Sequence, residues 1–255
     1  MKEHIISKGA KIDKSAIIGS YSIIEDGVAI GAHTVIDSYV CIKRGTTIGK
    51  NNRIHSGVQI GVEPQDYHFK GEDSQCIIGD YNVIREYATI SRATGENDIT
   101  IIGNNNFIMT YVHIAHNIKI GNNIIIASAT QIGGYVEIDD FANVGGLTGI
   151  HQFCRIGKYA MLGAKSYLNK DLPPYLLARG NRAKVYAVNI KGLRRNAFSQ
   201  AEIEDIKDLF RIVYTSFYNL TECLKILKKR PTTKHSDEFI KFVESSRRGI
   251  LLKTQ

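Results

Sequence analysis

Residues 22–48 read SIIEDGVAIGAHTVIDSYVCIKRGTTI, in which an isoleucine recurs at every sixth position from Ile24 to Ile48. Extended outward, the same spacing covers 25 positions of the chain, and each of them is Ile, Val or Leu. These positions are the multiples of six from 6 to 60, from 78 to 90 and from 102 to 168. A short fixed period of this kind is typical of solenoid proteins, in which one small unit is repeated and stacked.

The six-residue unit predicts a short strand followed by a corner. Glycine often follows the aliphatic residue, as at Gly19, Gly31 and Gly121, and it permits the backbone angles of a sharp corner. The residue two places before the aliphatic one is usually small or β-branched, so both side chains point inward. Because one side cannot bury its own face, we expect three sides to close a triangular coil of 18 residues. Roughly eight such coils would stack as parallel strands about 4.8 Å apart, which is an all-β solenoid of the parallel β-helix class.

Two interruptions and one end point divide the repeat. The period breaks at residues 61–77 and 91–101, which are polar, and we expect both segments to be loops that leave a rigid scaffold. The pattern stops after Leu168, and Pro173 and Pro174 mark a boundary. The sequence therefore predicts a β-helix over residues 1–170 and a C-terminal helical domain over residues 171–255.

The C-terminal third carries signals for helices. Ser199 and Glu202 form a capping box, which predicts a helix from about 200 to 217. A second helix is predicted to start at Thr221 and to end before Pro231, and a third to run from Ser236 to Ser246. We expect this tail to cover the open end of the solenoid, where strand edges would otherwise be exposed.

Composition indicates a reduced protein without a membrane span. No segment approaches the roughly 18 uncharged apolar residues that a membrane helix needs. Residues 1–10 lack the apolar centre of a signal peptide, so we expect a cytoplasmic protein. The four cysteines, Cys41, Cys76, Cys154 and Cys223, are far apart and form no C-x-x-C pair, which favours free thiols over disulfides or structural zinc.

The positive charge is concentrated in the tail. Residues 1–169 hold 15 Lys/Arg against 16 Asp/Glu, a net charge of −1, whereas residues 170–255 hold 18 against 9, a net charge of +9. Such a surface attracts nucleic acid, an anionic membrane or an acidic protein, and it can equally be a solvated helical face. No nucleic-acid-binding motif accompanies it, so we do not expect nucleic acid as a partner.

The 18-residue coil assigns residues to columns. His116 stacks below Gly134, which stacks below Gln152, and His113 stacks below Gln131 and Gly149. Histidine suits the removal of a proton from a hydroxyl at neutral pH, and a glycine one coil away lets a backbone N–H approach a reacting carbonyl. The alternative is a surface histidine beside a corner glycine.

Three histidines, His113, His116 and His151, suggest a metal site as a further possibility. Hexapeptide carbonic anhydrases bind zinc through three histidines. On an extended chain, however, residues three apart tend to face different ways, so His113 and His116 do not follow the helical H-E-x-x-H pattern. A general base is therefore the stronger interpretation, and no metal ligand is assigned.

Dispersed motifs carry a resemblance to a known family. They are spread over essentially the whole chain and are more specific than the hexapeptide signal. The chain resembles the acyl-ACP–UDP-N-acetylglucosamine O-acyltransferases of lipid A biosynthesis at 60–61 (IG), 64–66 (PQD), 84–86 (IRE), 113–116 (HIAH), 145–146 (GG), 151–154 (HQFC), 171–175 (DLPPY) and 189–195 (NIKGLRR).

The resemblance implies a left-handed β-helix, although parallel crossovers are normally right-handed. It also implies a homotrimer whose active sites lie between neighbouring solenoids. His116 would be the general base for the sugar 3-hydroxyl, which attacks the thioester of a 3-hydroxyacyl chain on acyl carrier protein, and Gly134 would supply the oxyanion N–H.

The remaining family positions imply substrate contacts. No bound cofactor is expected beyond the phosphopantetheine thioester that acyl carrier protein brings, and that acidic protein would give the basic tail a specific partner. Ala164 matches the position that gauges acyl length. The implied contacts to the UDP-amino-sugar and the donor are Gln65, Asp66, His68, His113, Tyr135, His151, Gln152, Asn189 and Arg195.

Departures from the family pattern gather around the same site. His68 stands where lysine is usual, Asn117 where aspartate is usual, and Tyr135 in place of another cleft histidine. Lys191 and Asn196 replace a glutamate and an arginine of the nucleotide-binding stretch.

These departures keep other hypotheses open beside transfer to a 3-hydroxyl. Transfer to a 3-amino UDP-sugar, or to a related nucleotide sugar, is the nearest alternative. A zinc carbonic anhydrase-like hydratase is an alternative of another class, and a non-catalytic scaffold that binds an acidic partner is the third.

Overall fold

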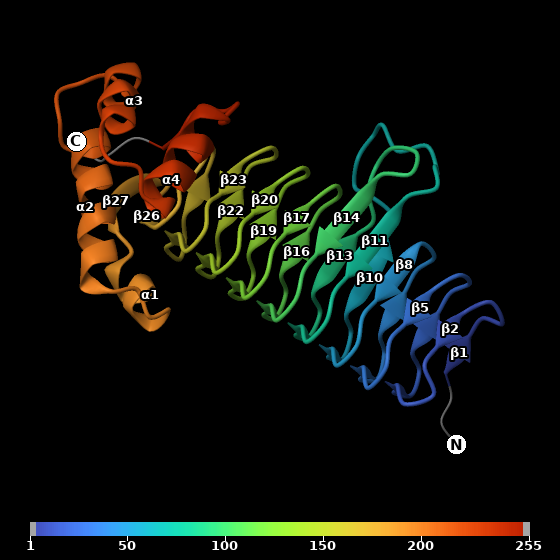
Figure 1. Cartoon of the computed structure of the whole chain (residues 1–255). Helices are drawn as coiled ribbons and strands as arrows, with labels where there is room; N and C mark the ends of the chain where they lie inside the picture. The colour runs from blue at the N-terminus through green and yellow to red at the C-terminus, as the bar shows by residue number, and fades with distance from the viewer. Residues whose placement is uncertain (1–3, 252–255) are drawn as a thin grey trace.

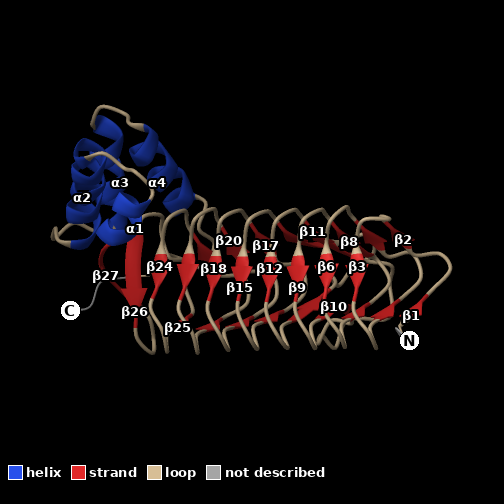
Figure 2. Ribbon diagram, turned by 90° about the horizontal axis from the view of Figure 1, so that it is seen from below, coloured by secondary structure: helices blue, strands red, loops and turns tan. Residues whose placement is uncertain are grey.

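The computed structural model describes residues 4–251, which form a long three-sided solenoid with a helical tail at one end (Figure 1). Three parallel sheets make the sides, and the chain visits them in turn, one short strand at a time. Figure 2 shows the coils stacked like rungs along the solenoid, with the helices beyond the last coils. The solenoid architecture predicted from the repeat is confirmed.

Each sheet collects every third strand from β1 to β25, and the third sheet is extended by β26 and by the antiparallel strand β27. The first sheet contains β1 (Ile5–Ile6), β4 (Ile23–Ile24), β7 (Cys41–Ile42), β10 (Gln59–Val62), β13 (Thr89–Ser91), β16 (His113–Ile114), β19 (Gln131–Ile132), β22 (Gly149–Ile150) and β25 (Tyr167–Leu168). The second contains β2 (Lys11–Ile12), β5 (Ala29–Ile30), β8 (Thr46–Ile48), β11 (Gln75–Ile78), β14 (Ile99–Ile102), β17 (Lys119–Ile120), β20 (Glu137–Ile138) and β23 (Arg155–Ile156). The third contains β3 (Ile17–Ile18), β6 (Val35–Ile36), β9 (Arg53–Ile54), β12 (Val83–Ile84), β15 (Phe107–Ile108), β18 (Ile125–Ile126), β21 (Asn143–Val144), β24 (Met161–Leu162), β26 (Leu176–Arg179) and β27 (Lys184–Val188).

Register is kept across both interruptions. Ile114 pairs with Ile132, as the 18-residue coil requires. Ile60 pairs with Ile90, and Ile90 with Ile114, so the inserted residues leave the aliphatic column intact. The inserted loops themselves are shorter than the breaks in the pattern, because β10, β11, β13 and β14 extend into them and leave 63–74 and 92–98 as loops. Figure 1 shows these loops projecting from the solenoid.

The core is the column of aliphatic side chains at multiples of six. Ile24, Ile42, Ile54 and Ile60 are completely buried, and the hydrophobic core continues from this column into the helical tail through residues such as Leu193. Burying each of these side chains contributes about 1.5–3 kcal/mol, so the stack of coils is held chiefly by this column together with its parallel hydrogen bonds.

The corner glycines serve a different purpose from the one that the sequence suggested. Among the glycines that follow an aliphatic residue, Gly61 alone has a positive φ, at +71°. In most corners the left-handed residue stands three positions after the aliphatic one. It is a non-glycine residue such as Tyr39 or Tyr111, or a glycine that does not follow an aliphatic residue, such as Gly27. A Cβ on Gly19 would lie 2.5 Å from the backbone of Asp37 in the next coil. These glycines are therefore needed for the close approach of successive coils.

Four helices follow the last coils: α1 (Ile190–Arg195), α2 (Gln200–Tyr214), α3 (Leu220–Lys229) and α4 (Lys234–Glu244). The capping box of Ser199 with Glu202 is present, and α2 ends at Tyr214 rather than at 217. Asn219 rather than Thr221 caps α3, because Asn219 and Glu222 form a capping box of their own. In the same way Thr233 caps α4, where the sequence suggested Ser236.

The sequence pattern did not reveal α1 or the hairpin of β26 and β27, which extends the third sheet before the helices begin. The division of the chain at residue 170 stays a prediction.

A buried asparagine ladder crosses the interrupted coils, at the inward position where smaller side chains were expected. Asn82 donates to the Asn52 Oδ1 atom at 3.0 Å and to the Gly103 carbonyl at 2.9 Å. Its own Oδ1 accepts the backbone N–H of Asn106 at 3.0 Å. All three asparagines are at most 1% exposed, so each bond replaces a lost water contact.

We predict that Asn82→Ala lowers the free energy of unfolding by about 2–3 kcal/mol, because it leaves the Gly103 carbonyl and the Asn106 N–H buried and unpaired. Chemical denaturation measures the change. Asn143→Ala is the matched control, since Asn143 lies on the outward face of β21 and its loss is expected to cost less than about 0.5 kcal/mol. Equal effects of the two substitutions would contradict the prediction.

Candidate active site

The corner between the first and second sheets brings the predicted site residues together. The loop 63–74 joins β10 to β11, the loop 92–98 joins β13 to β14, and His116 lies between β16 and β17. These connections belong to consecutive coils, so both loops and His116 meet at one edge of the solenoid. Gly134 occupies the same corner one coil further on.

His116 is held with one ring nitrogen fixed and the other free. The residue is 7% exposed, and its Nδ1 lies 2.9 Å from the Oδ1 of Asn117. That oxygen also accepts the backbone N–H of Thr94, while the Asn117 Nδ2 donates to the Thr94 carbonyl. Because the backbone of Thr94 fixes which way the Asn117 amide points, Nδ1 of His116 must be the donor. In the neutral imidazole, Nε2 is therefore the nitrogen that can accept a proton.

Gly134 lies directly against this nitrogen. A Cβ on Gly134 would be 2.7 Å from both Nε2 and Cε1 of His116. The carbonyl of Gly134 accepts the N–H of Phe153, and within residues 4–251 its own N–H has no hydrogen-bond acceptor. The stacking of Gly134 on His116, which followed from the 18-residue count, is confirmed, and it leaves a free N–H beside the base.

The first loop brings a carboxylate to the same nitrogen. One oxygen of Asp66, Oδ2, lies 3.7 Å from the Nε2 of His116. The other, Oδ1, accepts the backbone N–H of His68 at 3.0 Å and contacts the His68 Nδ1 at 2.9 Å. These two contacts, the backbone one foremost, hold the pKa of Asp66 below its usual range. Asp66 is thus an ionised acceptor at neutral pH, and His68 anchors it.

A hollow of about 430 Å³ lies over the first sheet in front of these groups. His113 contributes its ring, whose Nδ1 is 2.8 Å from the Thr89 hydroxyl. Burial, and then the neighbouring His116, lower the pKa of His113, which favours its neutral form. Six of the predicted site residues line this hollow, namely Gln65, His113, His116, Gly134, His151 and Gln152.

Tyr135 contacts the base from the side. Its ring packs edge-on against the His116 ring, with 5.3 Å between the ring centroids, and stacks on the Phe153 ring, with 4.7 Å between the centroids. Tyr167 also lines the hollow, although no sequence motif pointed to it. It follows Gly149 by 18 residues and pairs with it, so continuing the column of His113, Gln131 and Gly149 by one coil would have found it.

No group of three or more His, Cys, Asp or Glu side chains within residues 4–251 is arranged to hold a metal ion. In the same part of the chain, no helix is long and apolar enough to cross a membrane.

Comparison with known proteins agrees with this geometry. Residues 171–251 match the family model described as Udp N-acetylglucosamine O-acyltransferase, Domain 2, and residues 99–134 match Bacterial transferase hexapeptide (six repeats). An acyl-[acyl-carrier-protein]–UDP-N-acetylglucosamine O-acyltransferase of Paraburkholderia phymatum is 44% identical over 253 residues, 97% of each chain. The enzyme of the same name from Thermodesulfovibrio yellowstonii is 45% identical over 251 residues, 98% of this chain and 97% of its own.

The chain belongs to the UDP-N-acetylglucosamine O-acyltransferase family.

Solved structures agree with this membership. The UDP-N-acetylglucosamine acyltransferase of Francisella novicida superposes with a TM-score of 0.97 at 39% identity, over 100% of this chain and 94% of that one. The enzyme of Campylobacter jejuni superposes with a TM-score of 0.94 at 35% identity, over 100% and 99% of the two chains. These relatives give no support to the zinc hydratase or to the amide-forming alternative.

Two of the residues predicted to contact the substrates lie on another face of the solenoid. Asn189 and Arg195 line a hollow of about 670 Å³ between α1 and the third sheet. The Asn189 side chain caps α1 by accepting the Gly192 N–H, and it donates to the Tyr159 carbonyl at 2.8 Å. In one chain, therefore, neither residue joins His116.

Ala164 lies in the corner between β24 and β25, where its backbone packs against Gly145. Its role in measuring the acyl chain stays a prediction.

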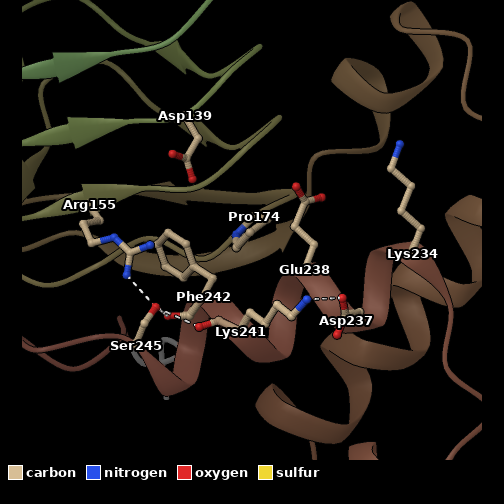
Figure 3. A pocket seen from close by; sticks show the side chains of 9 residues that line it. All are labelled: Asp139, Arg155, Pro174, Lys234, Asp237, Glu238, Lys241, Phe242 and Ser245. Atoms are coloured by element: carbon tan, nitrogen blue, oxygen red, sulfur yellow. Dashed lines mark hydrogen bonds and ion pairs between the residues drawn. The ribbon is translucent and has the colours of Figure 1, made fainter. Parts of the chain in front are cut away.

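A third hollow, of about 390 Å³, separates the second sheet from α4 (Figure 3). Arg155 lies over the Phe242 ring at 4.3 Å and donates to the Ser245 hydroxyl at 2.9 Å. Burial raises the pKa of Asp139 in this hollow to about 6. Since these contacts join the solenoid to the tail and none of the predicted site residues is among them, we regard the hollow as part of the structural junction.

We predict that Gly134→Ala lowers kcat/KM of the acyltransferase by about 100-fold or more, because the added methyl group displaces the His116 ring from its position. Steady-state kinetics measures the loss, and an unchanged melting temperature shows that the solenoid is intact. Activity close to that of the unmodified enzyme would contradict the assigned contact between Gly134 and His116.

Proposed function

We propose that this acyltransferase moves a 3-hydroxyacyl chain from acyl carrier protein to the 3-hydroxyl of UDP-N-acetylglucosamine, the first step of lipid A biosynthesis. The observation that carries the proposal is the free Nε2 of His116 between the Asp66 carboxylate and the unpaired N–H of Gly134. Relatives that cover 97–98% of the chain carry the name of this reaction.

The chemistry follows from these groups. His116 takes the proton of the sugar hydroxyl through Nε2 as the hydroxyl oxygen bonds to the thioester carbon. The N–H of Gly134 donates to the oxyanion that forms on the carbonyl oxygen. When the carbon–sulfur bond breaks, the protonated His116 returns its proton to the departing thiolate, and the ester is released. A neutral His113 beside the base avoids a second positive charge at that point.

Substrate contacts are distributed around this centre. Asp66 is ionised and can accept a hydrogen bond from a sugar hydroxyl next to the one that reacts. Gln65, His151 and Gln152 line the same hollow and offer further polar contacts. The net charge of +9 over residues 170–255 suits an acidic carrier protein as the docking partner. The cysteines are free, which fits a cytoplasmic enzyme.

We predict that His116→Ala lowers kcat by about 10²–10⁴-fold, the range for loss of a general base. The assay follows the mass of the product formed from UDP-N-acetylglucosamine and a 3-hydroxyacyl carrier protein. His4→Ala is the matched control, since His4 is exposed and directly precedes β1, the strand at the far edge of the first sheet. Full activity of His116→Ala would refute the proposed role of His116.

A homotrimer would complete the site. The hollow with His116 lies over the first sheet, and the hollow with Arg195 lies over the third sheet of the same chain. Two faces of one solenoid cannot meet, so a neighbouring chain must supply the second hollow if both contact one substrate. Closed cyclic symmetry would repeat this contact without leaving an open face.

We predict that His116→Ala and Arg195→Ala chains, each impaired alone, regain activity when unfolded and refolded together. With random mixing, about a quarter of the sites combine the intact His116 face of an Arg195→Ala chain with the intact Arg195 face of a His116→Ala chain. A mixture of His116→Ala with Gly134→Ala is the control, because both changes affect the same face and no intact site forms. Equal recovery in the two mixtures, or none in either, would contradict a site shared between chains.

A further inference from the structure

We infer that Asp98, in the second loop, is a positioning residue that acts on His116 through the side chain of Asn117. The inference rests on the proposed role of His116 as the general base. It assigns a function to a loop residue that no sequence motif singled out, and it explains how an enzyme with asparagine after its histidine links a carboxylate to the base through the asparagine amide.

The side chain of Asn117 has a complete set of partners. Its Oδ1 accepts from the Nδ1 of His116 at 2.9 Å and from the backbone N–H of Thr94 at 2.9 Å. Its Nδ2 donates to the Thr94 carbonyl at 3.0 Å and to the Oδ2 of Asp98 at 3.0 Å. These partners fix which end of the amide is Oδ1. The Asp98 carboxylate binds the Nδ2 end, so it acts on His116 through the Oδ1 end. The carboxylate polarises the amide, and the amide oxygen attracts the proton on Nδ1.

The second loop holds Asp98 in place for this contact. The N–H of Asp98 donates to the Gly95 carbonyl at 3.2 Å, and its carbonyl accepts the Gln75 N–H at 2.9 Å. Gly95 has a φ of +104°, and a Cβ there would lie 2.7 Å from the Oδ2 of Asp98. A side chain at residue 95 would therefore move the oxygen that bonds to Asn117. The turn needs glycine for its backbone angle and for this carboxylate.

The same loop is bonded to the loop that carries Asp66. The Asn97 N–H donates to the Asp73 carbonyl at 2.8 Å, and the Gly95 N–H donates to the Glu72 Oε1 at 3.3 Å. Asp98 is thus part of a network that fixes both loops and reaches both sides of His116. Loss of the Asp98 carboxylate is expected to affect the orientation of the His116 ring and the stability of its protonated form, and to leave the binding of the sugar largely unchanged.

The charged and titratable groups around His116 define what the pH dependence can report. Asp66 faces Nε2 from the first loop, His113 lies on the preceding strand, and Tyr135 packs on the ring from the next coil. Asp98 is the one carboxylate, among residues 4–251, that reaches the Nδ1 side through Asn117. Removing its charge makes the protonated imidazole less favourable, so the acid limb of the pH profile of kcat/KM moves to lower pH.

The first test is Asp98→Asn, which removes the charge and retains an oxygen that can accept from Asn117. We expect kcat to fall by roughly threefold to tenfold, KM for UDP-N-acetylglucosamine to change less than about twofold, and the acid limb to move to lower pH. The effect is expected to shrink at about 0.5 M salt, because Asp98 is exposed. Glu96→Gln, the same change in an exposed residue of the same loop, is the control and should match the unmodified enzyme.

The second test exchanges the two side chains. Asn117→Asp alone puts two carboxylates side by side, and we expect a loss of roughly tenfold to a hundredfold. Adding Asp98→Asn gives the new carboxylate an amide donor, while the Thr94 carbonyl still faces the oxygen that replaces Nδ2, so activity should rise at least about threefold above that of Asn117→Asp alone. The carboxylate then touches Nδ1 directly, and the acid limb should move to higher pH. Gly95→Ala, which displaces Asp98, should lower kcat in the same sense as Asp98→Asn.

The outcomes separate this inference from the proposed function. If His116→Ala is active, the role of the base is wrong and the role of Asp98 fails with it. If His116→Ala is inactive, but Asp98→Asn keeps the normal pH profile and the exchange is no better than Asn117→Asp alone, only the inference about Asp98 is overturned. Melting temperatures of all variants show whether a loss comes from unfolding.

Discussion

The whole molecule depends on the register between successive coils. Each coil can hydrogen-bond to the next only if equivalent residues face each other, and each aliphatic column is continuous only if the strands on both sides of an insertion keep this register. Gly19 and its counterparts let the backbones approach closely enough for this stacking. A shift of one residue in the register of a strand would turn its aliphatic side chain outward. The register is therefore specified separately at every coil.

This constraint gives the active site its precision. His116 and Gly134 are placed by strands whose spacing cannot vary, and a catalytic contact between neighbouring coils therefore needs no flexible segment to form it. The two loops contribute what the regular coil cannot, which is carboxylates and amides brought back over the corner. Asp66 approaches one nitrogen of the histidine, and Asp98 approaches the other through Asn117. A rigid scaffold that carries two inserted loops suits an enzyme whose acceptor must be chosen accurately.

The sequence alone predicted those parts of the structure that obey the period. The stacking of Gly134 on His116 followed from the 18-residue coil, and Tyr167 could have been found from the same spacing. The period could not place Asp98, because the loop residues have no equivalent in the next coil. The period also did not predict why glycine follows the aliphatic residue. The sequence suggested a need for unusual backbone angles, and these angles say nothing about close contact between coils.

The predicted starts of α3 and α4 were wrong for a related local reason. Thr221 and Ser236 are acceptable caps, but Asn219 and Thr233 have partners three residues later that complete a box, and a reciprocal pair of bonds stabilises a helix start more than a single cap does.

One departure from the family pattern, Asn117, is linked by a hydrogen bond to a loop carboxylate, Asp98. Asparagine beside the histidine cannot supply a negative charge, but its amide can both accept from the histidine and donate to a carboxylate, which aspartate cannot do. Such a change is compatible with the solenoid because Asn117 occupies the left-handed corner position, at φ +56°, where asparagine is tolerated without altering the register. Corners and loops are thus the places where this fold can change its chemistry while every aliphatic column, and with it the spacing of His116 and Gly134, stays fixed.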